Sequence, residues 1–199
     1  MQTQHLRGTD QQTVGRVADY VNNGHIVVIP TDTVYGVGCD ALNEAAICEL
    51  YRIKQRPTHK AIPILLADAS GLQQAAAYIP EIARPYIAQY WPGPLTIILP
   101  KHPHLPAVLS EDETIAVRIP GHEIARAVIR AAGGAMAVTS ANLSGQPVAE
   151  TAEQALNYFD GMAAAVLDAG PAPAALASTV LDCTGSQPVI LREGPLKRL

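Results

Sequence analysis

The sequence has few aromatic residues, few cysteines and no long apolar run. Aromatic residues make up 5% of the 199 residues, with one Trp and one Phe, so the chain offers little surface on which bases could stack. The three cysteines, Cys39, Cys48 and Cys183, form no Cys-x-x-Cys pair, and their odd number argues against a disulfide framework. We therefore expect unreactive thiols in a reducing cytosol.

Nothing in the sequence predicts a membrane protein or a secreted one. No segment approaches the roughly 20 apolar residues that a transmembrane helix needs. The first residues, MQTQHLR, lack the apolar core of a signal peptide. A cytoplasmic protein without a membrane partner is the expectation.

Positive charge is also scarce, because 14 Lys and Arg against 18 Asp and Glu give a net charge of −4. Such a chain has no overall attraction for nucleic acid or for an anionic membrane, so any cationic site must be local. By contrast, 48% of the residues are hydrophobic, which is enough for a sizeable core. The length favours a single domain over residues 1–199.

Apolar periodicity alternates between helix-like and strand-like segments. This alternation predicts an α/β fold, with a twisted mixed sheet and flanking helices. Pro63, inside one expected strand, predicts a sheet edge or a bulge there. The first predicted helix is capped by Asp10 and ended by Gly24, and the second is capped by Asn43 and stops before Pro57. Further helices are predicted over residues 72–77, 81–90, 124–132 and 151–159. The predicted strands cover residues 25–29, 62–67, 95–99, 114–119, 135–139, 165–167, 178–181 and 189–191.

The most distinctive stretch is residues 30–40, PTDTVYGVGCD. It follows an apolar run that predicts a buried strand, which Pro30 ends because proline cannot donate to the ladder. The short polar side chains and two glycines then predict a turn, and open α/β sheets hold small ligands at such turns. Taken alone, the stretch fits an ordinary loop with an Asx or ST turn slightly better.

A basic cluster lies at residues 52–60, with Arg52, Lys54, Arg56 and Lys60. Arg and Lys together suit a polyphosphate, Arg through bidentate hydrogen bonds and Lys as a compact charge. The alternative is a solvated helix C-terminus, where cations are favoured by the helix dipole. Arg52, in mid-helix, fits that alternative, and for the other three the two interpretations weigh the same.

Small polar residues and isolated arginines mark other candidate positions. The turn at residues 139–145, TSANLSG, offers hydroxyls and backbone N–H groups for phosphate or ribose, although alone it is a weak signal. Arg118 interrupts an apolar strand, so it needs a partner, either a structural carboxylate or a ligand. Ser178 enters a late strand, and Arg192 follows another.

Familiar catalytic sets are missing from the sequence. The six histidines form no His-Glu-x-x-His pattern, and no Gly-x-Ser-x-Gly or Walker A motif occurs. We therefore expect a site without a catalytic side chain, which works by positioning and charge neutralisation.

Taken together, seven motifs resemble those of the YrdC/TsaC family, the threonylcarbamoyl-AMP synthases, in family order and over nearly the whole chain. They are PTDTVYG at 30–36, KQRP at 54–57, WPGPLT at 91–96, VRIP at 117–120, SAN at 140–142, STV at 178–180 and LREG at 191–194.

The resemblance implies a YrdC-like fold with a concave cationic cleft, and a nucleotidyltransferase activity. L-threonine, bicarbonate or CO2, and ATP with Mg²⁺ would give threonylcarbamoyl-AMP and pyrophosphate. Partner proteins would transfer the threonylcarbamoyl group to the adenosine next to the anticodon of certain tRNAs. Weak tRNA binding would be compatible with this role.

The resemblance also implies roles for individual residues. Those matching the family's ATP-binding positions are Lys54, Arg56, Lys60, Thr114, Ser140, Asn142 and Arg192. Those matching the threonine-binding positions are Thr33, Tyr35, Arg118, Val138 through its backbone, and Ser178.

Two departures and one alternative accompany the resemblance. Some relatives have Pro in place of Ala61 and His in place of Leu65, and Leu65 cannot donate a hydrogen bond to threonine. Longer relatives carry a second domain whose linker covers the site, so here we expect another cover or a more open site. The alternative is an RNA- or ribosome-binding paralogue without synthase activity, although the chain keeps the Lys-x-Arg and Ser-x-Asn pairs that such relatives tend to lack.

Overall fold

The structure is a computed structural model that describes residues 2–174 and 176–197. The helices are α1 (Gln11–Asn22), α2 (Glu44–Lys54), α3 (Leu72–Ala75), α4 (Arg84–Tyr90), α5 (Glu123–Ala131) and α6 (Ala152–Phe159), with 3-10 helices η1 (Ala69–Gly71), η2 (Glu81–Ala83) and η3 (Ala107–Leu109). The strands are β1 (Gln4–Arg7), β2 (Val27–Ile29), β3 (Gly36–Asp40), β4 (Ile64–Leu66), β5 (Leu95–Pro100), β6 (Thr114–Arg118), β7 (Ala135–Ser140), β8 (Ala165–Asp168), β9 (Thr179–Asp182) and β10 (Val189–Arg192).

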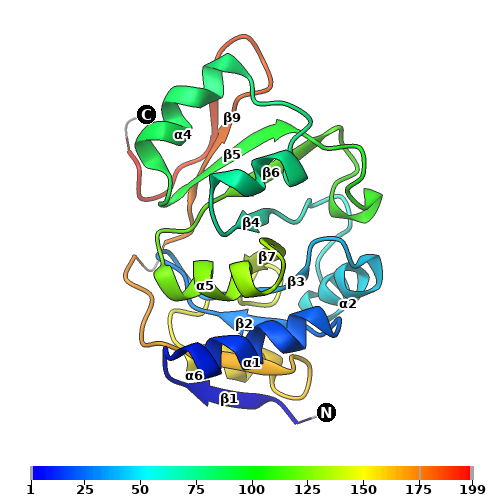
Figure 1. Ribbon diagram of the computed structural model, residues 1–199, viewed down its shortest axis with the longest axis vertical. Helices are drawn as coiled ribbons and strands as arrows, with labels where there is room; N and C mark the ends of the chain where they lie inside the picture. Colours follow the sequence, from blue (N-terminus) through cyan, green and yellow to red (C-terminus); the bar gives the residue numbers. More distant parts are fainter. Residues whose placement is uncertain (1, 175, 198–199) are drawn as a thin grey trace.

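One twisted sheet runs through the whole molecule (Figure 1). Its strands are ordered β1-β8-β2-β3-β7-β4-β6-β5-β9-β10. Parallel pairs such as β1 with β8 and β5 with β9 alternate with antiparallel pairs such as β3 with β7 and β5 with β6. The predicted α/β fold with a mixed sheet is therefore confirmed.

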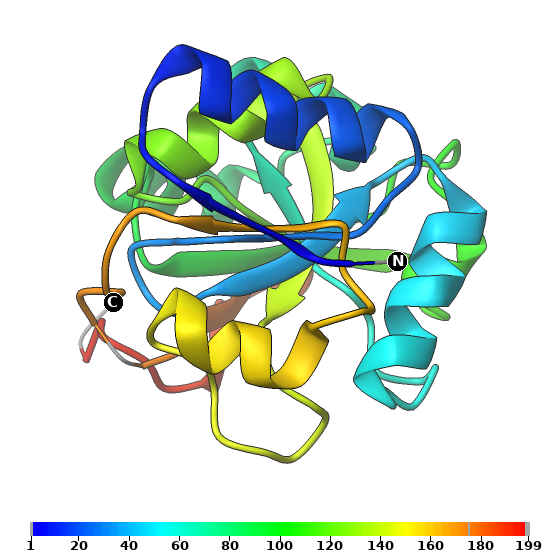
Figure 2. The ribbon, with the colours of Figure 1, turned by 90° about the horizontal axis from the view of Figure 1, so that it is seen from below.

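Strand periodicity divides the core into two layers. Val27 and Ile29 belong to the buried cluster under α1 and α5, whereas Val28 belongs to the cluster under α2 and α6. Successive strand residues point to opposite faces, so one apolar strand serves both layers. Figure 2 shows α1 and α5 on one side of the sheet and α6 on the other.

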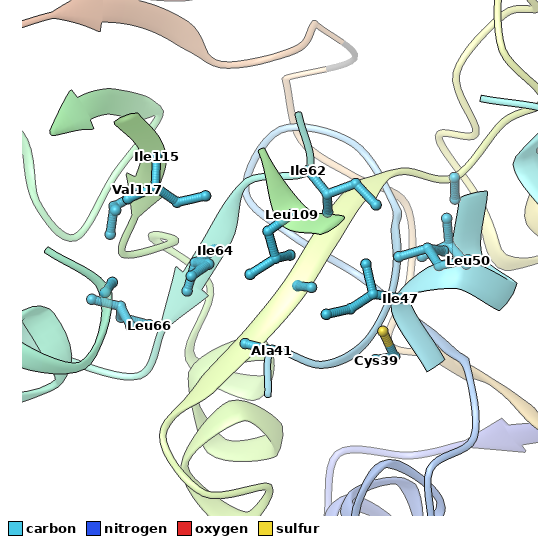
Figure 3. Close-up of a cluster of buried hydrophobic side chains, with 14 of the residues drawn as sticks. Cys39, Ala41, Ile47, Leu50, Ile62, Ile64, Leu66, Leu109, Ile115 and Val117 are labelled. Carbon is cyan, nitrogen blue, oxygen red and sulfur yellow. The ribbon is translucent and has the colours of Figure 1, made fainter. Parts of the chain in front are cut away.

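The layer under α2 is continuous from the helix to the centre of the sheet. Ile47 and Leu50 of α2 point toward Ile62 and Leu109 (Figure 3). Ile62 lies just before β4, and Leu109 is the last residue of η3. The Ile62 amide also donates to the Leu109 carbonyl at 2.9 Å. This packing fixes the C-terminus of α2, from which the basic cluster projects.

The helix starts follow the predicted capping residues. Side chains of Asp10, Asn43 and Thr151 accept from backbone amides three residues later, at 2.9, 3.0 and 3.2 Å. These bonds satisfy amides that have no partner inside the helix. The imidazole of His122 caps α5 in the same way, which the sequence did not predict.

Residues 30–40 differ from the predicted turn, because the turn ends at Tyr35 and β3 begins at Gly36. Gly38 stands in the strand, where an added Cβ would lie 2.4 Å from the Ala137 carbonyl oxygen and 2.6 Å from a Val138 methyl. This glycine therefore permits close packing of β3 on β7 rather than a loop.

One further expectation about strands was wrong, and one strand was missed. Pro63 marks no edge, because β4 lies inside the sheet between β7 and β6; the proline precedes the first paired residue, so no ladder bond is lost. The strand β1 was not predicted, and it is added to the sheet by parallel pairing with β8 far along the chain.

Among the described residues, no helix has both the length and the apolar character needed to cross a bilayer.

Candidate active site

A cavity of about 170 Å³ opens on one face of the sheet. Helices α1 and α5 cover part of this face, and the cavity lies on the part toward β10 that they leave uncovered. Its wall takes side chains from neighbouring strands: Val138 of β7, Leu65 of β4, Ala116 of β6, Thr96 of β5 and Val180 of β9. The register brings Leu65 beside Arg118, and Val180 beside both Thr96 and Arg192. Strand pairing thus gathers segments that are distant in sequence.

The turn after β2 forms one end of the cavity with two linked hydroxyls. Thr31 Oγ1 donates to the Val34 carbonyl at 2.6 Å, and it lies 3.0 Å from Thr33 Oγ1. Because the single hydroxyl proton of Thr31 is committed, Thr33 must donate to Thr31. Thr33 Oγ1 also accepts from Arg118 Nη1 at 2.9 Å, so one lone pair is left to face the cavity.

Arg118 is a buried guanidinium with a complete set of neighbours. It is 5% exposed, and it donates to Thr33, to the Gly93 carbonyl at 2.9 Å and to the carboxylate of Asp32. Burial lowers its pKa, the Asp32 carboxylate opposes this shift, and the positive charge of Arg192 adds to it. The predicted need of Arg118 for a partner is therefore met by Asp32.

Arg192 and Ser178 form the opposite wall. The Arg192 Nε and Nη2 donate to the Ser178 carbonyl at 3.0 and 2.8 Å, and Nη2 also donates to Ser178 Oγ at 3.1 Å. Ser178 Oγ lies 2.7 Å from Thr96 Oγ1. These contacts hold the guanidinium at the cavity through backbone and hydroxyl oxygens, and within the described chain it has no carboxylate partner.

Arg56 enters the cavity because the chain reverses direction after α2. Gln55 adopts a left-handed conformation with φ 51°, which ends the helix at Lys54. Arg56 then donates to the carbonyls of Lys60 and Ala61, at 2.9 and 2.8 Å. Burial lowers its pKa, as does the charge of Arg192, although nearby Tyr51 opposes the shift.

Lys54, two residues earlier, points elsewhere. It is 1% exposed and does not line the cavity; its ammonium donates to the carbonyls of Ser140 and Asn142 instead, each at 2.6 Å. Burial, followed by the charge of Arg56, lowers the Lys54 pKa to about 7.

The turn after β7, residues 140–146, lies above Lys54 and is held by its own hydrogen bonds. Ser140 Oγ donates to the side-chain oxygen of Asn142 at 2.6 Å. The Asn142 amide nitrogen donates to the carbonyls of Leu143 and Gln146 at 2.9 and 2.7 Å. Ser140 lines the cavity, whereas Asn142 shapes the turn behind it.

The remaining predicted residues are distributed as follows. Tyr35 is one of the cavity-lining residues, but its side chain belongs to the buried cluster under α2 and α6, and its hydroxyl donates to the Gly170 carbonyl at 2.6 Å; burial and the charge of Asp168 raise its pKa to about 12. The Val138 amide donates to the Pro63 carbonyl, so this N–H is not available to a ligand. Lys60 is an exposed residue outside the cavity lining.

Thr114 lies at the far end of β6, where it pairs with Pro100. Four residues of strand separate it from Arg118, which is about 13 Å. Thr114, Ala116 and Arg118 alternate onto one face, so Thr114 lies on the cavity side of the sheet. The cavity therefore gathers all five residues assigned to threonine and three of the seven assigned to ATP, Arg56, Ser140 and Arg192.

Sequence reasoning missed the roles of Asp32, Thr31 and Thr96. Asp32 had no visible partner, because Arg118 is 86 residues away. Thr31 and Thr96 lay inside quoted motifs, but only the structure pairs their hydroxyls with those of Thr33 and Ser178. Among the described residues, no group of three or more His, Cys, Asp or Glu could hold a metal ion.

The comparisons with known proteins agree with this geometry. A model of the Sua5/YciO/YrdC family, described as "Telomere recombination", matches residues 19–194. Threonylcarbamoyl-AMP synthase of Bacillus subtilis is 38% identical over 198 residues, which cover 98% of this chain and 57% of that protein. The protein of that name from Idiomarina loihiensis is 36% identical over 168 residues, which cover 81% and 89%.

A solved structure is similar over almost the whole chain. The crystal structure of Pyrococcus abyssi Sua5 complexed with L-threonine has a TM-score of 0.94 and 35% identity, and covers 98% of this chain and 58% of that one. The chain thus spans little more than half the length of the B. subtilis and P. abyssi proteins. Since the family model covers most of its residues, this chain belongs to the Sua5/YciO/YrdC family.

Proposed function

We propose that the chain is a threonylcarbamoyl-AMP synthase, which forms threonylcarbamoyl-AMP and pyrophosphate from L-threonine, bicarbonate or CO2, and ATP. The observation that carries the proposal is the convergence of Arg56, Arg118 and Arg192 on one hydroxyl-lined cavity in a chain of net charge −4. The names of the relatives and the threonine in the P. abyssi structure support it.

The Thr33 end of the cavity suits the α-amino and α-carboxylate groups of an amino acid. Arg118 uses three N–H groups on Thr33, Gly93 and Asp32, and an arginine has five, so two can bind a carboxylate. The free lone pair of Thr33 accepts from an ammonium or amine. About 170 Å³ is well below the roughly 300–1,000 Å³ of common ligand pockets, which fits a small amino acid.

The nucleotide must then extend beyond the cavity, over its rim. Arg56, Ser140 and Arg192 line the side of the cavity where phosphates would meet the amino acid. Thr114 lies on the same face of β6, which supports its assignment to a more distant part of ATP. Lys60 and Asn142 belong to the segments that carry Arg56 and Ser140, and we retain them as ATP-binding candidates.

The chemistry needs charge stabilisation more than a side-chain nucleophile. The threonine amine and bicarbonate form a carbamate with loss of water, and a carbamate oxygen attacks the α-phosphorus while pyrophosphate leaves. Fixed guanidinium groups stabilise the negative charge that spreads over the phosphoryl oxygens. Mg²⁺ would arrive with ATP as part of the substrate, and it would neutralise phosphate charge there.

The test is pyrophosphate release from ATP by the purified chain. Release that requires both L-threonine and bicarbonate is expected, together with a threonylcarbamoyl-AMP product visible by mass spectrometry. Release that is independent of threonine, or no release at all, would contradict the proposal. Salt-dependent tRNA binding without release would favour the RNA-binding alternative. Transfer of the product to tRNA by partner proteins is part of the proposal and needs a separate assay with those proteins.

A further inference from the structure

Lys54 carries a buried amino group that has no counter-charge among the described residues. It is 1% exposed, and both of its hydrogen bonds go to neutral carbonyls, those of Ser140 and Asn142. No carboxylate in the described part of the chain forms an ion pair with it. A buried, unpaired charge is strongly unfavourable, so Lys54 either loses its proton or acquires a negative charge nearby.

The surroundings of Lys54 supply none. Its own segment contributes Arg56, whose positive charge adds to burial in lowering the Lys54 pKa. Helix α2 packs on β3, which carries Cys39 and Asp40, and on η3, which precedes Glu111. Burial and Asp40 raise the Cys39 pKa to about 12, so that thiol is neutral, and neither Asp40 nor Glu111 is ion-paired with Lys54. The turn above Lys54, SANLS, contains no titratable side chain.

The hydrogen bonds of Lys54 determine how this turn faces the cavity. The carbonyls of Ser140 and Asn142 point toward the ammonium, so in trans peptides the N–H groups that follow them point away from it; that of Ala141 donates to the Tyr35 carbonyl at 2.7 Å. The Lys54 carbonyl also accepts from the Ser144 amide at 2.9 Å. Lys54 therefore holds the turn at three points, and the hydroxyl of Ser140 lies in the cavity wall.

We propose that Lys54 is a positioning residue whose counter-ion is a bound polyphosphate, held on the other side of the Ser140–Asn142 turn from the ammonium. Lys54 acts through the turn and does not touch the phosphates. The identification of the polyphosphate as that of ATP rests on the proposed function. The finding that Lys54 has no carboxylate partner among the described residues does not depend on it.

The proposal predicts that polyphosphate binding is linked to proton uptake. In the free protein Lys54 is mostly neutral above its pKa of about 7. A nearby anion favours the charged ammonium, so binding raises this pKa and Lys54 takes up a proton. A lysine that served only as packing would show no such linkage.

The experiment is titration calorimetry with inorganic triphosphate, in two buffers of different ionisation enthalpy, on the parent chain and Lys54→Met. At about pH 8 the parent should take up more protons per triphosphate than Lys54→Met does, by roughly half a proton or more, and at about pH 6 the difference should nearly vanish. The comparison removes the protonation of triphosphate itself. Arg52→Met, which alters an exposed cation of the same helix, should keep the full uptake.

Equal proton uptake by the parent and by folded Lys54→Met at pH 8 would overturn the inference. Lys54→Arg, which cannot lose its charge, should bind triphosphate with no excess uptake and should recover affinity relative to Lys54→Met. If Lys54→Met does not fold, the parent's own uptake, compared at the two pH values with that of Lys54→Arg, decides the question.

The proposed function fails separately from this inference. Proton uptake linked to triphosphate binding, without threonine-dependent pyrophosphate release, would leave the inference standing and remove the synthase assignment. Threonine-dependent pyrophosphate release without Lys54-dependent proton uptake would leave the synthase assignment standing and remove the inference.

Discussion

The two ends of the cavity hold their cations differently. At the Thr33 end, the buried guanidinium of Arg118 is ion-paired with Asp32. Beyond that end, Arg56 and Arg192 in the cavity wall, and Lys54 beneath the Ser140–Asn142 turn, bond to carbonyl and hydroxyl oxygens, without a carboxylate partner in the described chain. A paired cation keeps its geometry but little net charge, which suits a zwitterion such as threonine. Unpaired guanidinium groups such as those of Arg56 and Arg192 keep their charge for an anion such as a polyphosphate.

The largest expected effect is at the paired end. Arg118→Met leaves the partly buried Asp32 carboxylate without its partner, which should lower the free energy of unfolding by about 3 kcal/mol and abolish threonine binding. Urea unfolding and threonine titration measure both. The control is Arg52→Met, which removes an exposed cation paired with Glu49 and should unfold like the parent. If Arg118→Met unfolded like Arg52→Met, the distinction between paired and unpaired cations would be lost.

The unpaired end should respond to pH. The pKa of Lys54 is about 7 in the folded chain, below its ordinary 10.5, so the unfolded chain binds more protons between these values. The free energy of unfolding of the parent, relative to Lys54→Met, should therefore rise with pH across this window, by up to about 1.4 kcal/mol per pH unit. Urea unfolding at several pH values measures the difference. A flat difference would mean that Lys54 stays charged in the folded chain.

Removing an unpaired cation should affect activity more than stability. Arg56→Gln should lower threonine-dependent pyrophosphate release at least tenfold, about 1.4 kcal/mol in activation free energy. Lys54→Ala should lower it at least as much, because the Ser140–Asn142 turn loses its support. Arg52→Gln, four residues earlier on the exposed side of α2, is the matched control and should turn over like the parent. Parent-like rates for both Arg56→Gln and Lys54→Ala would remove the phosphate assignment.

The smallest expected effect concerns how far the nucleotide extends. Thr114→Val removes a hydroxyl on the cavity face of β6, and one neutral hydrogen bond contributes about 1 kcal/mol. The KM for ATP should rise roughly fivefold while kcat is unchanged. Steady-state kinetics with varied ATP measure this split. An unchanged KM would restrict the nucleotide to the Ser140 end of the cavity.

Local patterns in the sequence predicted most helices and strands. Capping residues Asp10, Asn43 and Thr151 each bond to an amide three residues away, so nearby sequence was sufficient. The strand β1 and the continuation of residues 36–40 as β3 were not predictable in this way. Both depend on partners far along the chain, β8 for the first and β7 for the second.

The candidate site shows the same division. Eight of the twelve residues that the resemblance assigned line the cavity; Lys54, Lys60, Thr114 and Asn142 are not among the lining residues. The motifs did not distinguish the role of Lys54 from that of Arg56, because the two residues lie close together in one short motif. The left-handed Gln55 turns Arg56 into the cavity, while Lys54 stays beneath the turn after β7.

The amino-acid sequence by itself determined the α/β class, the starts of three helices and the residue types that can neutralise phosphate. These follow from periodicity and from bonds between near neighbours. Only the tertiary structure decided that Asp32 neutralises Arg118 while Lys54 has no counter-charge in the part of the chain that the structure describes. The reason is physical: charge compensation in a protein interior depends on distances of a few ångströms between strands, and strand register sets those distances.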